Sequence, residues 1–152
     1  MIDLAALARI ALIALVVAST SACSSGQLSP GLTARMDQGG AQLNRAEAIG
    51  IINHYRSTVG VGPLTEDPAL NATAATMAAS YAKTGRQASK PDGTLEIRYS
   101  AGYATFAETF SGWRNSLQQS QVMSGAAATR VGIAVTYEAT SPYGVYWVVI
   151  VG

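Results

Sequence analysis

Along the first half of the chain, apolar residues recur every three or four positions, which is the spacing of an amphipathic helix. The first such series consists of Ile49, Ile52, Tyr55 and Val59. Asn44 followed three residues later by Glu47 is a capping-box start, and the Gly-Val-Gly-Pro run at 60–63 stops a helix. The pattern therefore predicts a helix over residues 45–58.

A second apolar series follows Asp67-Pro68, where aspartate suits the N-cap and proline the first helical position. Its members share one helical face and are Leu70, Ala74, Met77, Ala78 and Tyr81. We expect a helix over 68–84 that ends before Gly85. Its many alanines allow close approach to the neighbouring element.

A second capping box, formed by Thr105 and Glu108, opens a shorter helix that should end near Ser116. Trp113 lies on this helix and is predicted to be a buried core anchor. Upstream, a polar loop with a Pro-Asp-Gly turn is followed by Leu95–Tyr99, whose alternation predicts a short strand.

The last third of the chain has the patterns of strands. From 131 to 137, bulky and small residues alternate, and after a turn at 140–144 an unbroken apolar run extends over Val145–Val151. A strand covered on both faces requires such a run. We therefore predict an antiparallel hairpin inside an α/β fold, an α-β-α sandwich with a small sheet and helices on both faces.

The N-terminus has the pattern of an export leader. Leu4–Ala18 is almost wholly apolar, and at about fifteen residues it is short for a membrane span. The small residues before Cys23 resemble the lipobox of bacterial lipoproteins, in which the cysteine is lipidated. We expect a signal peptide over 1–22 and a lipidated, flexible tether over 23–43. The alternative is an ordinary signal peptide cut after Ala22.

Charge narrows the choice of partners. The chain has 10 basic and 9 acidic residues, and neither kind forms a run. A nucleic-acid surface needs a concentrated basic patch, so this class is not expected. Once the leader is removed, the length suits one domain, which we place at 44–152. Cys23 is the only cysteine, so no disulfide can form inside this domain.

Several short pieces resemble the CAP superfamily, or SCP domain, of cysteine-rich secretory proteins, antigen 5 and plant pathogenesis-related proteins. In chain order they are Ile52-Asn53-His54-Tyr55-Arg56, Gly60, Pro63-Leu64, Asp67-Pro68-Ala69-Leu70, Ser100-Ala101-Gly102-Tyr103, Phe110-Ser111-Gly112-Trp113-Arg114-Asn115-Ser116, Arg130-Val131-Gly132-Ile133-Ala134 and Tyr146-Trp147. The resemblance is greatest to short bacterial members without cysteines in the domain. It implies an α-β-α sandwich, in agreement with the periodicity.

The resemblance also implies a cleft of histidine and glutamate side chains, which in some members holds a divalent metal. Here Gln119 stands where the bacterial W-x-x-S-x-x-H pattern has its histidine, and residues 85–95 contain no other. Glu96 lies one residue out of register, and Glu108 is already used in a capping box. We expect a degenerate cleft around Glu96, Tyr103, Glu108 and Gln119, with no catalytic residue, metal or cofactor.

The only histidine, His54, lies on the first predicted helix and away from the family cleft positions. A zinc site or a Ser-His-acid triad would need further ligands or a base that the sequence does not supply. We therefore interpret His54 as an ordinary surface or boundary residue.

These observations favour an exported, non-catalytic binding or interaction module of the bacterial cell envelope. It would be held at the periplasmic face or cell surface by a lipid on Cys23, and its ligand would be a lipid, a wall component or a protein. The alternative is a hydrolase acting on peptidoglycan or protein, with Glu96 and Glu108 as paired carboxylates. A tethered structural spacer is a third reading.

Overall fold

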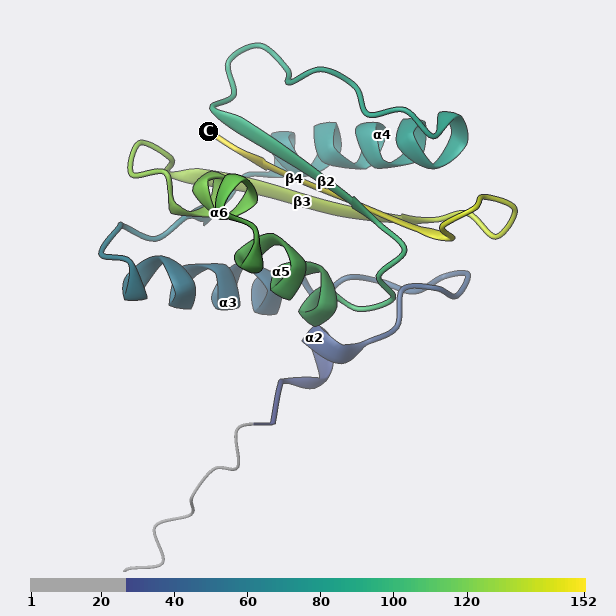
Figure 1. Cartoon of the computed structure of the whole chain (residues 1–152), viewed down its shortest axis with the longest axis horizontal. Helices are drawn as coiled ribbons and strands as arrows, with labels where there is room; N and C mark the ends of the chain where they lie inside the picture. The colour runs from purple at the N-terminus through teal and green to yellow at the C-terminus, as the bar shows by residue number, and fades with distance from the viewer. Residues whose placement is uncertain (1–26) are drawn as a thin grey trace, which may run out of the picture.

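The computed structural model describes residues 27–152 (Figure 1). The predicted signal peptide and Cys23 lie outside these residues. The helices and strands are α2 (Pro30–Thr33), α3 (Arg45–Thr58), β1 (Thr65–Glu66), α4 (Pro68–Thr84), β2 (Glu96–Ala101), α5 (Phe106–Asn115), α6 (Leu117–Ser124), β3 (Arg130–Tyr137) and β4 (Val145–Val151). Within the described part of the chain, no helix is both long and apolar enough to cross a membrane.

The three long helices begin at the caps that the sequence predicts. The Asn44 side chain accepts from the backbone N–H of Glu47 at the start of α3, and Asp67 accepts from two N–H groups at the start of α4. Thr105 and Glu108 form a complete capping box at the start of α5. These side chains satisfy N–H groups that the first helical turn leaves open. The predicted bounds of α3 and α4 are confirmed.

The sheet has the strand order β1-β3-β4-β2. β4 is antiparallel to both of its neighbours, whereas the two-residue β1 runs parallel to β3. All seven residues of β4 are buried. The hairpin, the interior position of β4 and the α-β-α sandwich are therefore confirmed.

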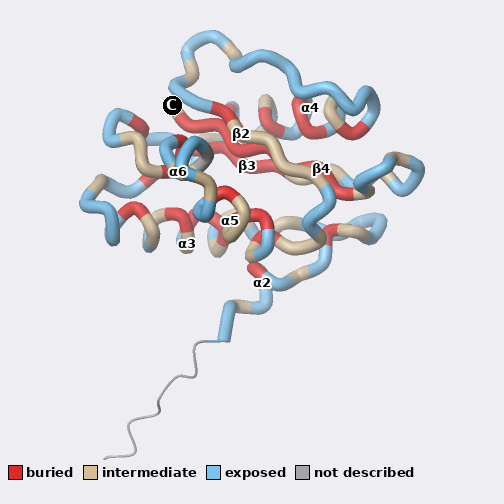
Figure 2. The backbone as a smooth tube through the Cα atoms, viewed as in Figure 1, coloured by how far each residue is buried: buried red, intermediate tan, exposed pale blue. Residues whose placement is uncertain are grey.

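Helices cover both faces of the sheet, as Figures 1 and 2 show. α4 packs on one face, and α2, α3, α5 and α6 lie on the other. Alternate residues of β4 point into the two resulting layers. Those facing α3 and α5 are Val145, Trp147, Val149 and Val151, and those in the α4 layer include Val148 and Ile150. Trp113 is 1% exposed in the first layer, as predicted.

α4 lies very close to β3, and Gly132 makes this possible. A methyl group at Gly132 would lie 2.5 Å from the backbone nitrogen of Asn71 and from the Leu70 Cβ. Only hydrogen fits there, because interior packing leaves no slack for a backbone to retreat. Small residues alternate along β3, and α4 is rich in alanine. These small side chains allow the close contact that the sequence predicts.

The prediction of a flexible tether over 23–43 is wrong for its C-terminal part. Leu32 and Met36 are 6% and 3% exposed and belong to the core layer shared with α3 and α5. The Met36 N–H also donates to the carbonyl of Ala104 at 2.7 Å. The folded unit therefore begins before residue 44. Isolated apolar residues in a Ser- and Gly-rich stretch have no period that would reveal this packing.

α6 and β1 were not predicted either, and both are short. α6 starts at Ser116 without a side-chain cap, and its buried residues Val122 and Met123 are adjacent rather than periodic. β1 consists of two exposed residues and is held by its parallel pairing with β3. β2 begins at Glu96, one residue after the predicted start, and continues to Ala101.

Candidate functional site

Two residues of the Asn-His-Tyr-Arg piece make structural contacts. Asn53 exchanges two hydrogen bonds with the backbone of Leu64, through Nδ2 at 2.9 Å and Oδ1 at 2.8 Å. This pair fixes α3 against the chain that leads into β1. His54 lies between Asn53 and Arg56 in the sequence and is exposed on α3. This agrees with its interpretation as a surface residue.

Arg56 is fully buried, with 0% of its surface exposed. Its guanidinium donates to the carbonyl oxygens of Gly62, Met123, Gly125 and Ala128 at 2.5 to 3.2 Å. Burial lowers the pKa of Arg56 from its ordinary value, because desolvation disfavours the charged form. Arg56 thereby joins α3 to the loops before β1 and after α6.

The two faces of β2 carry different chemistry. Ile97 is buried in the layer against α4, and Tyr99 packs on the same layer. Arg98 points to the opposite side, where its guanidinium donates to the carbonyl of Gln118 in α6 at 2.9 Å. It also donates to the carbonyl of Ile97 at 2.7 Å. Arg98 therefore bridges β2 and α6 in the region where the resemblance places the family cleft.

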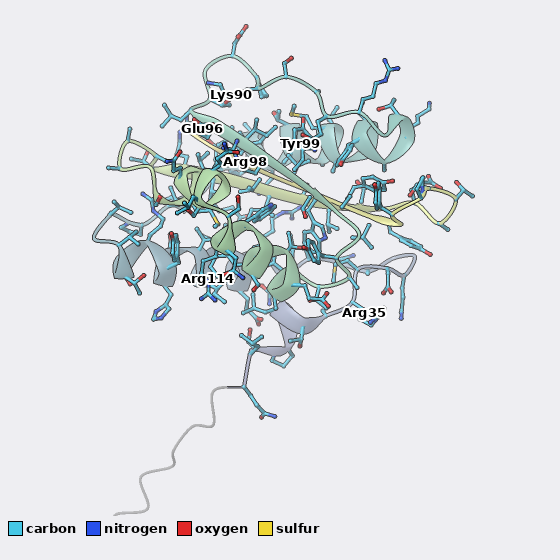
Figure 3. The ribbon with its side chains drawn as sticks, in the orientation of Figure 1. Arg35, Lys90, Glu96, Arg98, Tyr99 and Arg114 are labelled. Carbon is cyan, nitrogen blue, oxygen red and sulfur yellow. The ribbon has the colours of Figure 1, made fainter. Side chains whose placement is uncertain are left out.

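Glu96 lies on β2 beside Arg98, as Figure 3 shows. Its carboxylate is 3.7 Å from the Arg98 guanidinium, with half of the Glu96 side chain exposed to solvent. Such a long, solvated pair contributes little to stability. Ile97 next to it faces α4, so a shift of one residue in register does change the face.

A polar cavity of about 350 Å³ lies beside this bridge. It is lined by Gln87, Ala88, Ile97, Arg98, Tyr99 and Gln118, and is called the β2–α6 pocket below. The Tyr99 hydroxyl donates to the carbonyl of Ala88 at 3.0 Å and so holds the loop after α4 against β2. Burial raises the pKa of Tyr99 above its ordinary value.

Glu108 and Tyr103 lie together, away from Glu96. Both line a shallow cavity of about 460 Å³ over α5, where the Tyr103 ring packs on Gly112. The Glu108 carboxylate accepts from the backbone N–H and the hydroxyl of Thr105, each at 2.9 Å. Glu108 thus caps α5, near the end of β2 opposite to Glu96. The structure does not bring the two glutamates into one site.

Gln119 belongs to α6, beside the Gln118 carbonyl that Arg98 binds. Its side chain is outside the described part of the structure. Across residues 27–152, no three His, Cys, Asp or Glu side chains gather closely enough to hold a metal ion.

Sequence reasoning missed Arg98 as a residue of this region. The available signal was the out-of-register Glu96, which Arg98 follows two positions later. Its effect depends on the backbone of α6, which the sequence did not predict. Figure 3 places Arg98 with Glu96 and Tyr99 on the same strand.

Solved structures of bacterial proteins share this fold. An outer surface protein from Borrelia burgdorferi aligns with a TM-score of 0.57 and 15% identity, over 74% of this chain and 97% of its own. An extracellular SCP-domain protein from Bacillus anthracis gives 0.58 and 13%, over 70% of this chain and 39% of its own. A cysteine-rich secretory protein from Staphylococcus aureus gives 0.53 and 12%, over 70% and 37%. At these identities the likeness concerns the fold.

The chain spans well under half the length of the Bacillus and Staphylococcus proteins that it matches, but nearly all of the Borrelia protein. A search of curated proteins found no match. Residues 49–151 match the family model described as CAP, the cysteine-rich secretory protein family. This match covers more than half of the sequence and confirms the resemblance of the short pieces. The chain belongs to the CAP family.

Proposed function

We propose that this chain is a non-catalytic binding module of the bacterial cell envelope, anchored by a lipid on Cys23. The observation that carries the proposal is the Arg98 bridge. Where the family cleft gathers histidine and glutamate side chains, this chain sets a guanidinium that is bound to the carbonyls of Gln118 and Ile97. An arginine stays protonated at neutral pH, so it offers no general base.

The engagement of both candidate carboxylates supports the same proposal. Glu96 pairs with Arg98, and Glu108 caps α5 through Thr105. Two-carboxylate hydrolases place the pair about 5 to 10 Å apart across one cavity. Here Glu96 and Glu108 lie toward opposite ends of β2. The cavity over α5 is lined by Glu108 and Tyr103 but not by Glu96. A pair acting on one bond is disfavoured by this arrangement.

Support for the envelope location comes from the leader pattern and from the matched proteins. The Borrelia protein is described as an outer surface protein and the Bacillus protein as extracellular. Both descriptions support an exported location for this chain. Lipid attachment at Cys23 is our own extension, based on the lone cysteine after a run of small residues. In this role the ligand is a lipid or a wall component.

The proposal is tested by metal analysis of the purified full chain and by muropeptide release from isolated cell walls, with casein as a protein substrate. We expect no stoichiometric metal and no release above that of buffer. Retention of the chain on washed cell walls or lipid vesicles is the positive readout. A release activity that Glu96→Gln or Glu108→Gln abolishes, with an unchanged unfolding temperature, would establish the hydrolase instead.

The variant Arg98→Gln tests whether the bridge matters for this behaviour. It removes the charge that β2 presents to α6 while leaving an amide able to donate one hydrogen bond. We expect the variant to fold and to remain without hydrolytic activity. The variant Gln119→His restores the histidine of the bacterial pattern, and we expect no tight zinc binding by it, because zinc needs at least three protein ligands and residues 85–95 supply no second histidine.

A further inference from the structure

A third cavity lies at the end of the sheet away from the β2–α6 pocket. It has a volume of about 380 Å³ and is enclosed by the C-terminal end of α4, residues 82–85, and by the turn between β3 and β4. Glu138, Tyr143 and Tyr146 also line it. None of its lining residues belongs to the β2–α6 pocket. We call it the turn pocket.

One residue of the turn-pocket wall, Tyr146, carries a buried hydroxyl group whose hydrogen-bonding capacity is unused. Tyr146 is 0% exposed, and its ring packs edge-on against Tyr81 at 4.9 Å and Tyr143 at 6.3 Å between centroids. Within the described residues, its Oη has no hydrogen-bond partner. Buried polar groups in native proteins are nearly always satisfied, so an unsatisfied hydroxyl on a residue that lines a cavity needs an explanation, and a bound ligand is one. Phenylalanine would have filled the same space without this penalty.

Tyr143 provides an aromatic surface at the rim of the pocket. It is 61% exposed, although its neighbour Tyr146 is fully buried. The turn that carries Tyr143 is fixed, because the Glu138 N–H donates to the Gly144 carbonyl at 2.7 Å and Gly144 adopts a positive φ of 70°. An exposed tyrosine on a hydrogen-bonded turn is a suitable stacking surface for the apolar face of a ligand.

The polar groups of the pocket are balanced in charge. Lys83 contributes one cation, and Glu138 contributes one carboxylate, which accepts from the Thr140 hydroxyl at 2.7 Å. The last turn of α4 adds backbone carbonyl acceptors, since Gly85 satisfies only the carbonyl of Tyr81. A phosphate or carboxylate ligand would meet these carbonyls unfavourably. A neutral ligand rich in hydroxyl groups can donate to them and to Glu138 and accept from Lys83.

We propose that the turn pocket binds a neutral saccharide. One sugar ring places its apolar C–H face on Tyr143, and a ring substituent supplies the missing partner of the Tyr146 hydroxyl. Hydroxyl groups of the sugar donate to the carbonyls at the end of α4. This inference rests on the proposed function for its setting, and it gives that binding module a ligand class.

Calorimetric titration of the full chain, kept in a detergent without a sugar headgroup, tests the proposal. The probes are chitohexaose, maltohexaose and dextran. We expect saturable binding of at least one probe, weakened about tenfold or more by Tyr143→Ala, because central aromatic contacts carry much of the energy of small interfaces. Tyr143→Phe should retain most of the affinity.

Tyr146→Phe is the most informative variant. It keeps both edge-on ring contacts and removes only the unpartnered Oη. Binding should weaken, while the unfolding temperature stays the same or rises, because no internal hydrogen bond is lost. A merely structural tyrosine would give the opposite pair of results. His54→Gln, at an exposed position of α3, is the control and should change neither quantity.

The proposal is overturned if none of the probes binds at about 10 mM, or if binding is unchanged in Tyr143→Ala and Tyr146→Phe. Sedimentation with isolated cell walls and lipid vesicles separates this failure from that of the proposed function. Binding to walls or vesicles without binding to a saccharide would support the envelope role and contradict the assignment of the turn pocket. Binding of the probes through Tyr143 together with release of muropeptides would support the turn pocket as a saccharide site and contradict the non-catalytic role.

Discussion

The side chain of Asn71 satisfies the backbone N–H of Ile133 on the edge of β3 that β1 leaves unpaired. The Ile133 N–H donates to Asn71 Oδ1 at 2.9 Å, just beyond the point where β1 stops pairing with β3. The Ile133 carbonyl accepts from Arg45 Nε, also at 2.9 Å. Two side chains from different helices thus take the place of a missing strand, which leaves less of the edge open to another chain.

Replacing Asn71 by Ala should therefore lower the free energy of unfolding by about 1 to 3 kcal/mol, the usual cost of leaving a buried N–H without a partner. Urea denaturation measures this loss. Thr76→Ala on the same helix is the control, because the Thr76 hydroxyl bonds only to the carbonyl of Ala72 within α4. Equal stability of the two variants would show that the Asn71 contact contributes nothing.

Gly132→Ala should destabilise the fold by about 1 to 3 kcal/mol or more, because the new methyl group would collide with the α4 backbone at Asn71. Thermal unfolding measures the loss. The matched control is Gly50→Ala, on the exposed side of α3 where a methyl group meets nothing within 4 Å. That change should raise stability by about 1 kcal/mol through helix propensity. A stable Gly132→Ala protein would mean that α4 can move away from β3.

Arg56→Met should cost more than about 3 kcal/mol, since four carbonyl oxygens lose a charged donor in the interior. Methionine keeps most of the apolar stem, so the measured loss reports on the hydrogen bonds. Arg114→Met, at an exposed position of α5, should stay within about 0.5 kcal/mol of the parent. Comparable losses for both arginines would contradict the structural role of Arg56.

The cap of α4 predicts a specific dependence on acid. The pKa of Asp67 lies below its ordinary value of 3.8, first because its carboxylate accepts from the Leu70 and Ala69 N–H groups, and also because Arg130 is 2.7 Å away. A carboxyl whose pKa is depressed by folding adds stability above its unfolded pKa. This contribution is lost as the pH falls through the folded value.

Asp67→Asn keeps an N-cap acceptor and removes the titration. The stability difference between parent and variant should be constant near neutral pH and shrink as the pH falls below about 3.8, where the unfolded carboxyl becomes protonated. Denaturation at a series of pH values gives this curve. A difference that grows on acidification would contradict the depressed pKa.

Lipidation at Cys23 predicts that radiolabelled palmitate enters the parent chain and not Cys23→Ala. The variant should also leave the membrane fraction, because acyl chains provide the anchoring energy. Carbonate washing of membranes, followed by immunoblotting, measures the distribution. A variant that remains with the membrane would reject the anchor and favour an ordinary signal peptide.

Local sequence signals were sufficient for the long elements of this fold. The caps at Asn44, Asp67 and Thr105 act within one helical turn, so the sequence around them predicts where α3, α4 and α5 begin. The unbroken run of β4 likewise predicts a strand buried on both faces. α2 and α6 have neither caps nor a clear period, and they are held by contacts with distant parts of the chain.

The candidate sites were less predictable because they depend on such distant contacts. Arg98 acts on a carbonyl 20 positions away, and Arg56 on one 72 positions away. The unpartnered Tyr146 hydroxyl can be recognised only after the surrounding layers are in place. By contrast, the sequence alone shows that Gln119 stands where the bacterial pattern has its histidine.

The strand order also constrains when the sheet can form during synthesis. β4, the last of the four strands in sequence, is the sole partner of β2 within the described sheet and the main partner of β3. The sheet therefore cannot close while residues 145–151 are still on the ribosome or inside a translocation pore. Contacts between distant positions form slowly in any case. If the leader directs export as we propose, this delay keeps the chain unfolded for longer, because the interior strand β4 is the last of the four to be made.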